Sequence, residues 1–124
     1  MSHIIVPVDK DAGPITVDIK IGYPIFAQFQ FTRYDENGRN PQVVFQGINS
    51  DTIPDTFTVD PISLVNAFLH CQFMLHQHQV QPGARYKIDV TFNQGQSEIY
   101  RMSADDTFTA QSQYFVQLIK FEEA

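Results

Sequence analysis

The sequence predicts an all-β protein, a single β-sandwich of about seven to nine strands with Greek-key connections that covers residues 1–124. Three observations support this prediction. Several segments alternate apolar and polar residues, and Gly, Pro, Asn and Asp gather between those segments. The composition is 43% hydrophobic with eleven Phe and no Trp, so the core has to be built from Phe and aliphatic side chains.

The first half of the chain shows the alternation most clearly. Residues 15–21 place four apolar side chains on one face, and residues 25–34 resume the alternation after a break at Gly22-Tyr23-Pro24. Asn37-Gly38 precedes the return segment 42–48, and Asn-Gly between two alternating runs predicts a hairpin because both residues tolerate positive φ. After the short apolar segment 3–8, the expected strands of this half are therefore 15–21, 25–34, 42–48 and 55–59.

Residues 61–79 fit two structures. For a helix, Asp60 is a suitable N-cap and Pro61 a suitable first residue, which gives the alternative of an α+β fold with one helix at about 61–78 packed on an antiparallel sheet. For a strand, apolar residues at 69, 71, 73 and 75 alternate with His70, Gln72, His76 and His78. We favour the strand, because Gln72 and His76 would interrupt the apolar side of a helix.

The segment that follows indicates a corner. Val80-Gln81-Pro82-Gly83-Ala84-Arg85-Tyr86 leads into a strand in which residues 86, 88, 90 and 92 are apolar. This run resembles the corner of fibronectin type III and related immunoglobulin-like sandwiches. The resemblance implies a structural corner at Pro82, Gly83 and Tyr86, in which the Tyr86 hydroxyl bonds back to the backbone. It also implies that the segment before the corner is a strand, and that Gly95-Gln96-Ser97 forms the next hairpin.

The last part of the chain predicts further strands. Residues 97–102 form one, Ser103-Ala104-Asp105-Asp106 is expected to be a turn, and residues 113–121 form the last. Residues 113–121 carry apolar side chains on both faces, so either both faces are covered or one face is an interface.

Charge narrows the classes of partner. The formal net charge is −6, and the eight Lys and Arg residues are scattered without a run or stripe. We therefore expect neither nucleic acid nor a membrane as a partner. The first residues lack the pattern of a signal peptide, so a cytoplasmic location is expected, with a secreted form trimmed of its signal as the alternative.

His76 and His78 are the candidate metal ligands. On a strand, residues i and i+2 point to the same face about 6–7 Å apart, and two imidazoles placed so can bind one divalent transition metal. A third ligand would have to come from another strand. Without a metal, the same residues are the polar face of a strand near its end, and no cofactor is then expected.

Surplus aromatic residues are the remaining candidates. Phe26, Tyr34, Phe68 and Tyr114 fall on faces that are otherwise polar, and aromatic side chains are enriched in protein interfaces. The leading hypothesis is a non-catalytic protein-interaction or assembly module that binds a protein partner, a further copy of itself, or both. The alternatives are a metal-binding protein or metalloenzyme that uses His76 and His78, and a sandwich that binds carbohydrate or another small ligand. No catalytic motif stands out, so the sequence leans away from an enzyme.

Overall fold

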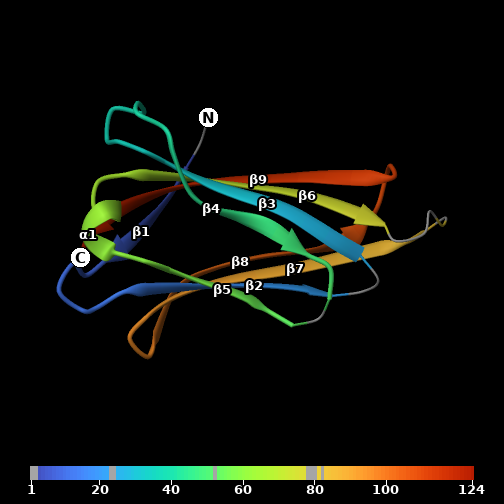
Figure 1. Cartoon of the computed structure of the whole chain (residues 1–124), viewed down its shortest axis with the longest axis horizontal. Helices are drawn as coiled ribbons and strands as arrows, with labels where there is room; N and C mark the ends of the chain where they lie inside the picture. Colours follow the sequence, from blue (N-terminus) through green and yellow to red (C-terminus); the bar gives the residue numbers. More distant parts are fainter. Residues whose placement is uncertain (1–2, 23–24, 52, 78–80, 82) are drawn as a thin grey trace.

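The protein is built from two β-sheets packed face to face (Figure 1). The structure is a computed structural model, and it describes residues 3–22, 25–51, 53–77, 81 and 83–124. The elements are β1 (Ile4–Val8), β2 (Ile15–Gly22), β3 (Ile25–Tyr34), β4 (Gln42–Asn49), β5 (Asp55–Val59), α1 (Pro61–Leu64), β6 (Phe68–Gln77), β7 (Arg85–Gln94), β8 (Ser97–Thr107) and β9 (Ser112–Glu123). The five-stranded sheet has the order β1-β9-β6-β3-β4, and the four-stranded sheet has the order β5-β2-β7-β8. The predicted all-β sandwich is confirmed.

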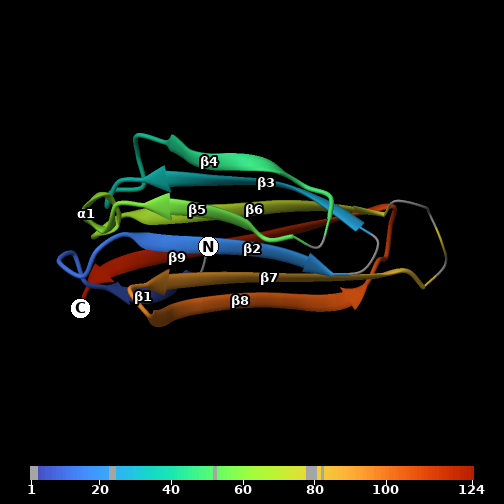
Figure 2. The same ribbon diagram turned by 60° about the horizontal axis from the view of Figure 1, so that its bottom comes forward.

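The connections tie the two sheets together. β3–β4 and β7–β8 are hairpins within one sheet, whereas every other pair of consecutive strands crosses between the sheets (Figure 2). The pairing is antiparallel except between β1 and β9, which run parallel with Ile4 opposite Ile119. The edge strands of the two sheets therefore lie near one another: β4 is near β5 on one side of the sandwich, and β1 is near β8 on the other.

The segment that fitted both a helix and a strand contains a short helix followed by a long strand. Asp60 caps α1, because its carboxylate accepts a hydrogen bond from the backbone N of Ile62 at 3.0 Å, and Pro61 is the first helical residue. The helix ends after Leu64, and Asn66 takes the left-handed conformation at φ 63° before β6 begins. The alternative of a helix over 61–78 is therefore wrong, and β6 has the predicted alternation of buried and half-buried residues.

The predicted turn at 103–106 is wrong, because these residues continue β8. Their polar side chains are held by the neighbouring strand, where Ser103 donates to the Asp89 carboxylate at 2.6 Å and Arg85 pairs with Asp105 at 2.9 Å. A strand at the edge of a sheet with one solvated face accommodates such residues. The chain turns after Thr107, where the Phe108 backbone N bonds to the Ala84 carbonyl at 2.8 Å.

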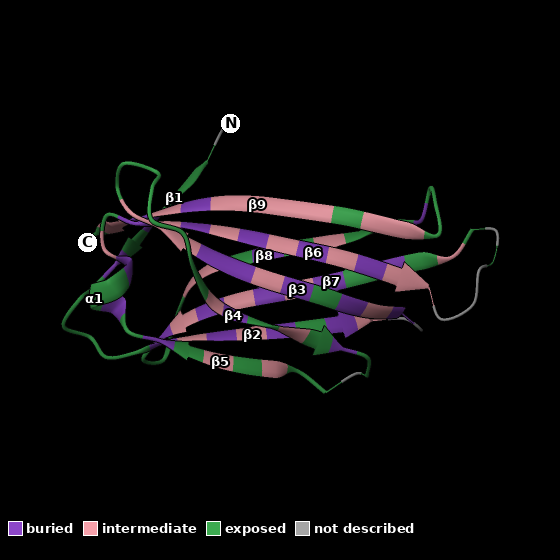
Figure 3. Cartoon of the chain, turned by 45° about the horizontal axis from the view of Figure 1, so that its top comes forward, coloured by how far each residue is buried: buried purple, intermediate pink, exposed green. Residues whose placement is uncertain are grey.

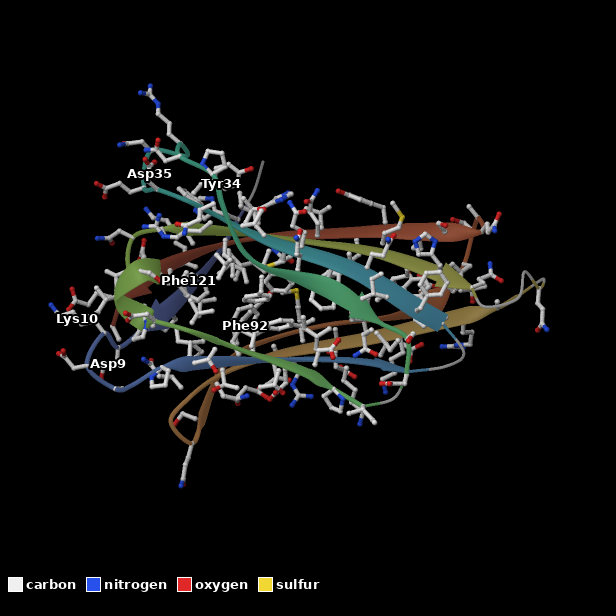
Figure 4. All side chains as sticks on the ribbon, in the orientation of Figure 1. Asp9, Lys10, Tyr34, Asp35, Phe92 and Phe121 are labelled. Carbon is white, nitrogen blue, oxygen red and sulfur yellow. The ribbon has the colours of Figure 1, made fainter. Side chains whose placement is uncertain are left out.

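Phenylalanine side chains fill the space between the sheets. Buried residues alternate with less buried ones along β2, β6 and β7 (Figure 3). Phe31 of β3 and Phe73 of β6 meet edge to face with ring centroids 5.4 Å apart, and both are fully buried. Phe92 of β7 brings the four-stranded sheet into this cluster, 6.1 Å from Phe121 of β9 (Figure 4). Burying each of these side chains stabilises the fold by roughly 1.5–3 kcal/mol.

The predicted corner lies partly outside the described residues, because Val80 and Pro82 belong to the undescribed part. Gly83 has φ 74°, which agrees with a turn, and Tyr86 is buried in β7. The Tyr86 ring packs edge-on against Phe108 at 5.1 Å, and burial, with the nearby Asp106, raises the pKa of its hydroxyl. The hydrogen bond across the corner, and with it the resemblance to fibronectin type III domains, stays a prediction.

The Asn37-Gly38 segment forms the predicted hairpin connection between β3 and β4, and the Asp35 side chain organises it. Its carboxylate accepts hydrogen bonds from the backbone N atoms of Asn37 and Arg39, both at 2.9 Å, and from the Asn40 amide at 2.6 Å. Positive φ occurs at Gly38 and Asn40 rather than at Asn37. The bond from the Arg39 backbone, followed by those from Asn40 and Asn37, holds the pKa of Asp35 below its ordinary value of 3.8.

This arrangement predicts how the stability contributed by Asp35 depends on pH. Because the folded pKa is depressed, the contribution is present above pH 3.8 and is lost as the pH falls through the folded pKa. We expect Asp35→Ala to lower the unfolding temperature near neutral pH, and the wild type and variant to converge in acid. Asn37→Ala is the control, because it keeps the backbone donor. A gap that stays constant down to acid pH would contradict the assignment, as would an NMR titration of Asp35 at or above 3.8.

Candidate functional site

The outward side of the five-stranded sheet, called the outer face below, is defined by alternation and register. Residues paired across strands point to the same side of a sheet, so the partners of the half-buried residues of β6 also point outward. The outer face comprises Phe68, His70, Gln72, Met74 and His76 of β6; Phe26, Gln28, Gln30, Thr32 and Tyr34 of β3; Ser112, Tyr114, Val116, Leu118, Lys120 and Glu122 of β9; Val43, Gln46 and Ile48 of β4; and Ile5 and Pro7 of β1.

The outer face is almost free of charge. Among its residues, Lys120 and Glu122 alone are acidic or basic apart from histidine, and they face each other across 4.0 Å at the end near β1. Lys120 also lies over the Phe68 ring, 5.6 Å from its centroid. The charge of this sheet is therefore confined to one end of its surface.

The outward side of the four-stranded sheet is different, because charged residues cover it. Arg101 pairs with Glu98 at 2.8 Å, and Arg85 pairs with Asp105 at 2.9 Å. The carboxylate of Asp18 accepts from the Thr56 hydroxyl at 2.7 Å. Exposed pairs of this kind contribute little to stability, and they are typical of a surface in contact with water. The two sides of the sandwich therefore differ in charge.

Apolar and aromatic side chains occupy much of the outer face. Tyr114 is 50% exposed, and Ile48, Val43 and Ile5 are 61%, 47% and 54% exposed. The four aromatic residues predicted as an interface all lie here, although they come from three strands. Phe26 pairs in register with His76, Tyr34 with Phe68, and Tyr114 with Met74. Figure 4 shows Tyr34 at the hairpin end of this sheet. Whether these residues form an interface stays a prediction.

A row of three glutamines crosses the middle of the outer face. Gln72, Gln30 and Gln46 are opposite one another on β6, β3 and β4. They line a shallow groove of about 480 Å³ together with Gln28, Ile48, Met74 and Tyr114. The Gln72 amide donates to the Tyr114 hydroxyl, and the Gln30 amide donates to the Thr32 hydroxyl at 3.3 Å. The groove is thus polar but uncharged, since amides provide its donors and acceptors.

His76 lies at the far end of the outer face, and both of its ring nitrogens are in hydrogen bonds. Its ring stacks on Phe26 with centroids 4.6 Å apart. Because the Gln28 Oε1 atom can only accept, Nε2 donates to it at 3.0 Å, and Nδ1 accepts from the Ser112 hydroxyl at 2.8 Å. The second predicted ligand, His78, lies outside the described residues. Among those that are described, no three His, Cys, Asp or Glu side chains could together hold a metal ion.

Cys71 offers no nucleophile to the surface. Its side chain is fully buried on the core side of β6, with Sγ 3.9 Å from the Leu69 carbonyl. Burial raises the pKa of this thiol well above its ordinary value, so the thiolate is disfavoured. The residue therefore acts as a small apolar side chain of the core.

Sequence reasoning found the aromatic members of the outer face but missed the glutamine row. Each glutamine was visible as a polar residue within an alternating strand. Their alignment depends on pairing between strands that are far apart along the chain, and alternation within one strand carries no information about that register. The Gln-rich composition of the segments 28–30, 42–46 and 72–79 was the available signal.

Comparisons with protein-family models, with curated protein sequences and with solved structures found no match to this chain. Within the described part of the structure, none of the helical segments is long and apolar enough to cross a membrane.

The geometry of His76 makes the metal hypothesis testable. A metal ion on this ring would have to displace the hydrogen bond with Ser112 or with Gln28. We therefore expect protein purified without an affinity tag to contain no stoichiometric transition metal by mass spectrometry, and His76→Ala to leave the metal content unchanged. About one equivalent of metal per chain, lost in both His76→Ala and His78→Ala, would instead establish the metal site.

Proposed function

We propose that this protein is a non-catalytic interaction or assembly module and that the outer face is its contact surface. The observation that carries the proposal is the contrast between the two sides of the sandwich. The four-stranded side is covered with paired charges, whereas the outer face combines aromatic, aliphatic and amide side chains. Protein interfaces show the same bias, because their centres are depleted of charge and enriched in aromatic residues and Met.

The cost of removing water explains why this composition suits a contact. Burying an unpaired charge is far more expensive than burying an amide, and an amide recovers its cost by forming hydrogen bonds with the partner. The glutamine row supplies such amides in the middle of the outer face, and Tyr114 and Met74 beside it supply apolar area. Lys120 and Glu122 stay at one end, where a polar rim is expected.

The size of the outer face also fits a protein contact. The ten residues of β6 span about 30 Å, and five strands are about 20 Å wide between their outer axes. The product, roughly 600 Å², approaches the ~800 Å² that each partner contributes to an interface of standard size. The outer face is therefore large enough to bind a folded partner, either another protein or a second copy of this chain.

A photo-crosslinking amino acid placed in the protein in its native cells tests this proposal. At position 114 the benzophenone side chain replaces Tyr114 in the middle of the outer face, and we expect it to give one or a few discrete crosslinked products. The matched control carries the same group in place of Thr91, which points outward from the four-stranded sheet beside Arg101. We expect little crosslinking there, because that side stays in water.

A second substitution checks that the products reflect a specific contact. Val116→Lys places a charge next to the photo-crosslinker on β9, and we expect it to abolish the discrete products. Equal crosslinking from positions 114 and 91, or none from position 114, would overturn the proposed contact surface.

A further inference from the structure

Apart from a bulge opposite Phe31 and Thr32, the edge of the five-stranded sheet at β4 lacks the features that normally prevent strands from pairing. β4 bonds to β3 on one side, and no described strand lies on its other side. Its sequence, QVVFQGIN, contains no charged residue and no proline over eight residues. An edge of this kind exposes unpaired backbone N–H and C=O groups that can bond to another strand.

The other three edges are protected. β1 has five residues and includes Pro7, which has no N–H to donate. β5 also has only five residues and begins with Asp55. β8 is long but carries Glu98, Arg101, Asp105 and Asp106. Charges, proline, short length and bulges are the usual means by which proteins keep edges apart, so the regular part of β4, residues 45–49, stands out as the unprotected edge.

We propose that β4 pairs with β4 of a second copy of this chain, so that two five-stranded sheets join into one continuous sheet across a two-fold axis. Two identical strands related by a two-fold axis run antiparallel. Antiparallel pairing also brings the end of β4 that follows Arg39 next to the end that precedes Asp51, so opposite charges flank the contact. This edge is a different surface from the outer face, and the proposal does not require the outer face to bind anything.

Alternation restricts the register of the pair. Phe45 is buried and points toward the core, whereas Gln46 and Ile48 point outward. Residues opposite one another must point to the same side, and only residues 45–49, beyond the bulge, alternate regularly, so the two-fold axis passes beside Gly47. This axis places outward Gln46 opposite outward Ile48 and buried Phe45 opposite buried Asn49. It also places the two copies of Gly47 opposite each other, where neither has a side chain that could collide.

The protected edges limit the assembly to two copies. Each chain offers one unprotected edge, and β1 at the opposite end of the same sheet contains Pro7. Both β4 edges are therefore paired when two copies meet, so further copies cannot add by the same contact to form an open fibre. Two eight-residue strands bury less than a standard interface of about 1,600 Å², so we expect a weak, reversible dimer at concentrations of hundreds of micromolar.

Sedimentation velocity of the wild type and two matched variants tests the proposal. Gln46→Lys places a positive charge on each side of the proposed axis, opposite Ile48 of the other copy, and we expect it to weaken the dimer at least about tenfold. Gln72→Lys adds the same charge to the same glutamine row two strands from the edge, and we expect it to leave the dimer intact. Both variants reduce the net charge of −6 equally, so general repulsion cannot explain a difference between them.

A cysteine variant gives a readout that does not depend on affinity. The double variant Gln46→Cys/Ile48→Cys should form a disulfide-linked dimer in air, since Cα atoms of opposed residues lie about 4.5–5.5 Å apart, within disulfide range. The native Cys71 is buried and does not compete.

Three outcomes would overturn edge pairing: a wild-type monomer up to about 1 mM, a dimer that Gln72→Lys disrupts as strongly as Gln46→Lys, or a Gln46→Cys/Ile48→Cys variant that forms no disulfide-linked dimer. Discrete crosslinks from position 114 together with a monomeric wild type would leave the proposed contact surface standing and remove edge pairing alone.

Discussion

The packing of phenylalanine rings between the two sheets is the interaction on which the rest of the structure depends. With no tryptophan in the chain, the space between the sheets, typically about 10 Å, is filled by rings such as Phe31, Phe73 and Phe92. Phe45 and Phe57 add a parallel stack at 4.4 Å that closes the sandwich where β4 lies near β5. Because every second residue of a strand points inward, this packing decides which residues are left for the surface.

The outward residues of the two sheets make different kinds of interaction. On the four-stranded side they form ion pairs and hydroxyl–carboxylate hydrogen bonds, which suit contact with water. On the outer face, Tyr114 and Ile48 remain exposed beside glutamine amides, and Phe26 is covered by the His76 ring. These outer positions are not part of the core cluster, so packing between the sheets does not require their neutrality. The proposed contact with another protein would account for it.

Alternation within a strand could be read from the sequence, and it located most of the fold. Gln72 and His76 fit one face of a strand better than the apolar side of a helix, and the structure has them on one face of β6. The turn expected at 103–106 failed because Ser103 and Asp105 also suit a solvated edge strand, and the Asp89 and Arg85 side chains that hold them come from β7. The glutamine row and the partners of His76 depend on register between distant strands, which local patterns do not encode.

We propose that the outer face is covered in the working state of the protein and that the opposite side is not. NMR with a soluble paramagnetic probe measures this directly, because side chains in contact with solvent relax faster. Spectra are recorded for the purified monomer at low concentration and for the protein in its native assembly. The account predicts that the methyl groups of Ile48, Met74 and Val116 lose the probe's effect on assembly, whereas those of Thr56 and Thr91 keep it. An equal effect on both sides in the assembled state would contradict the account.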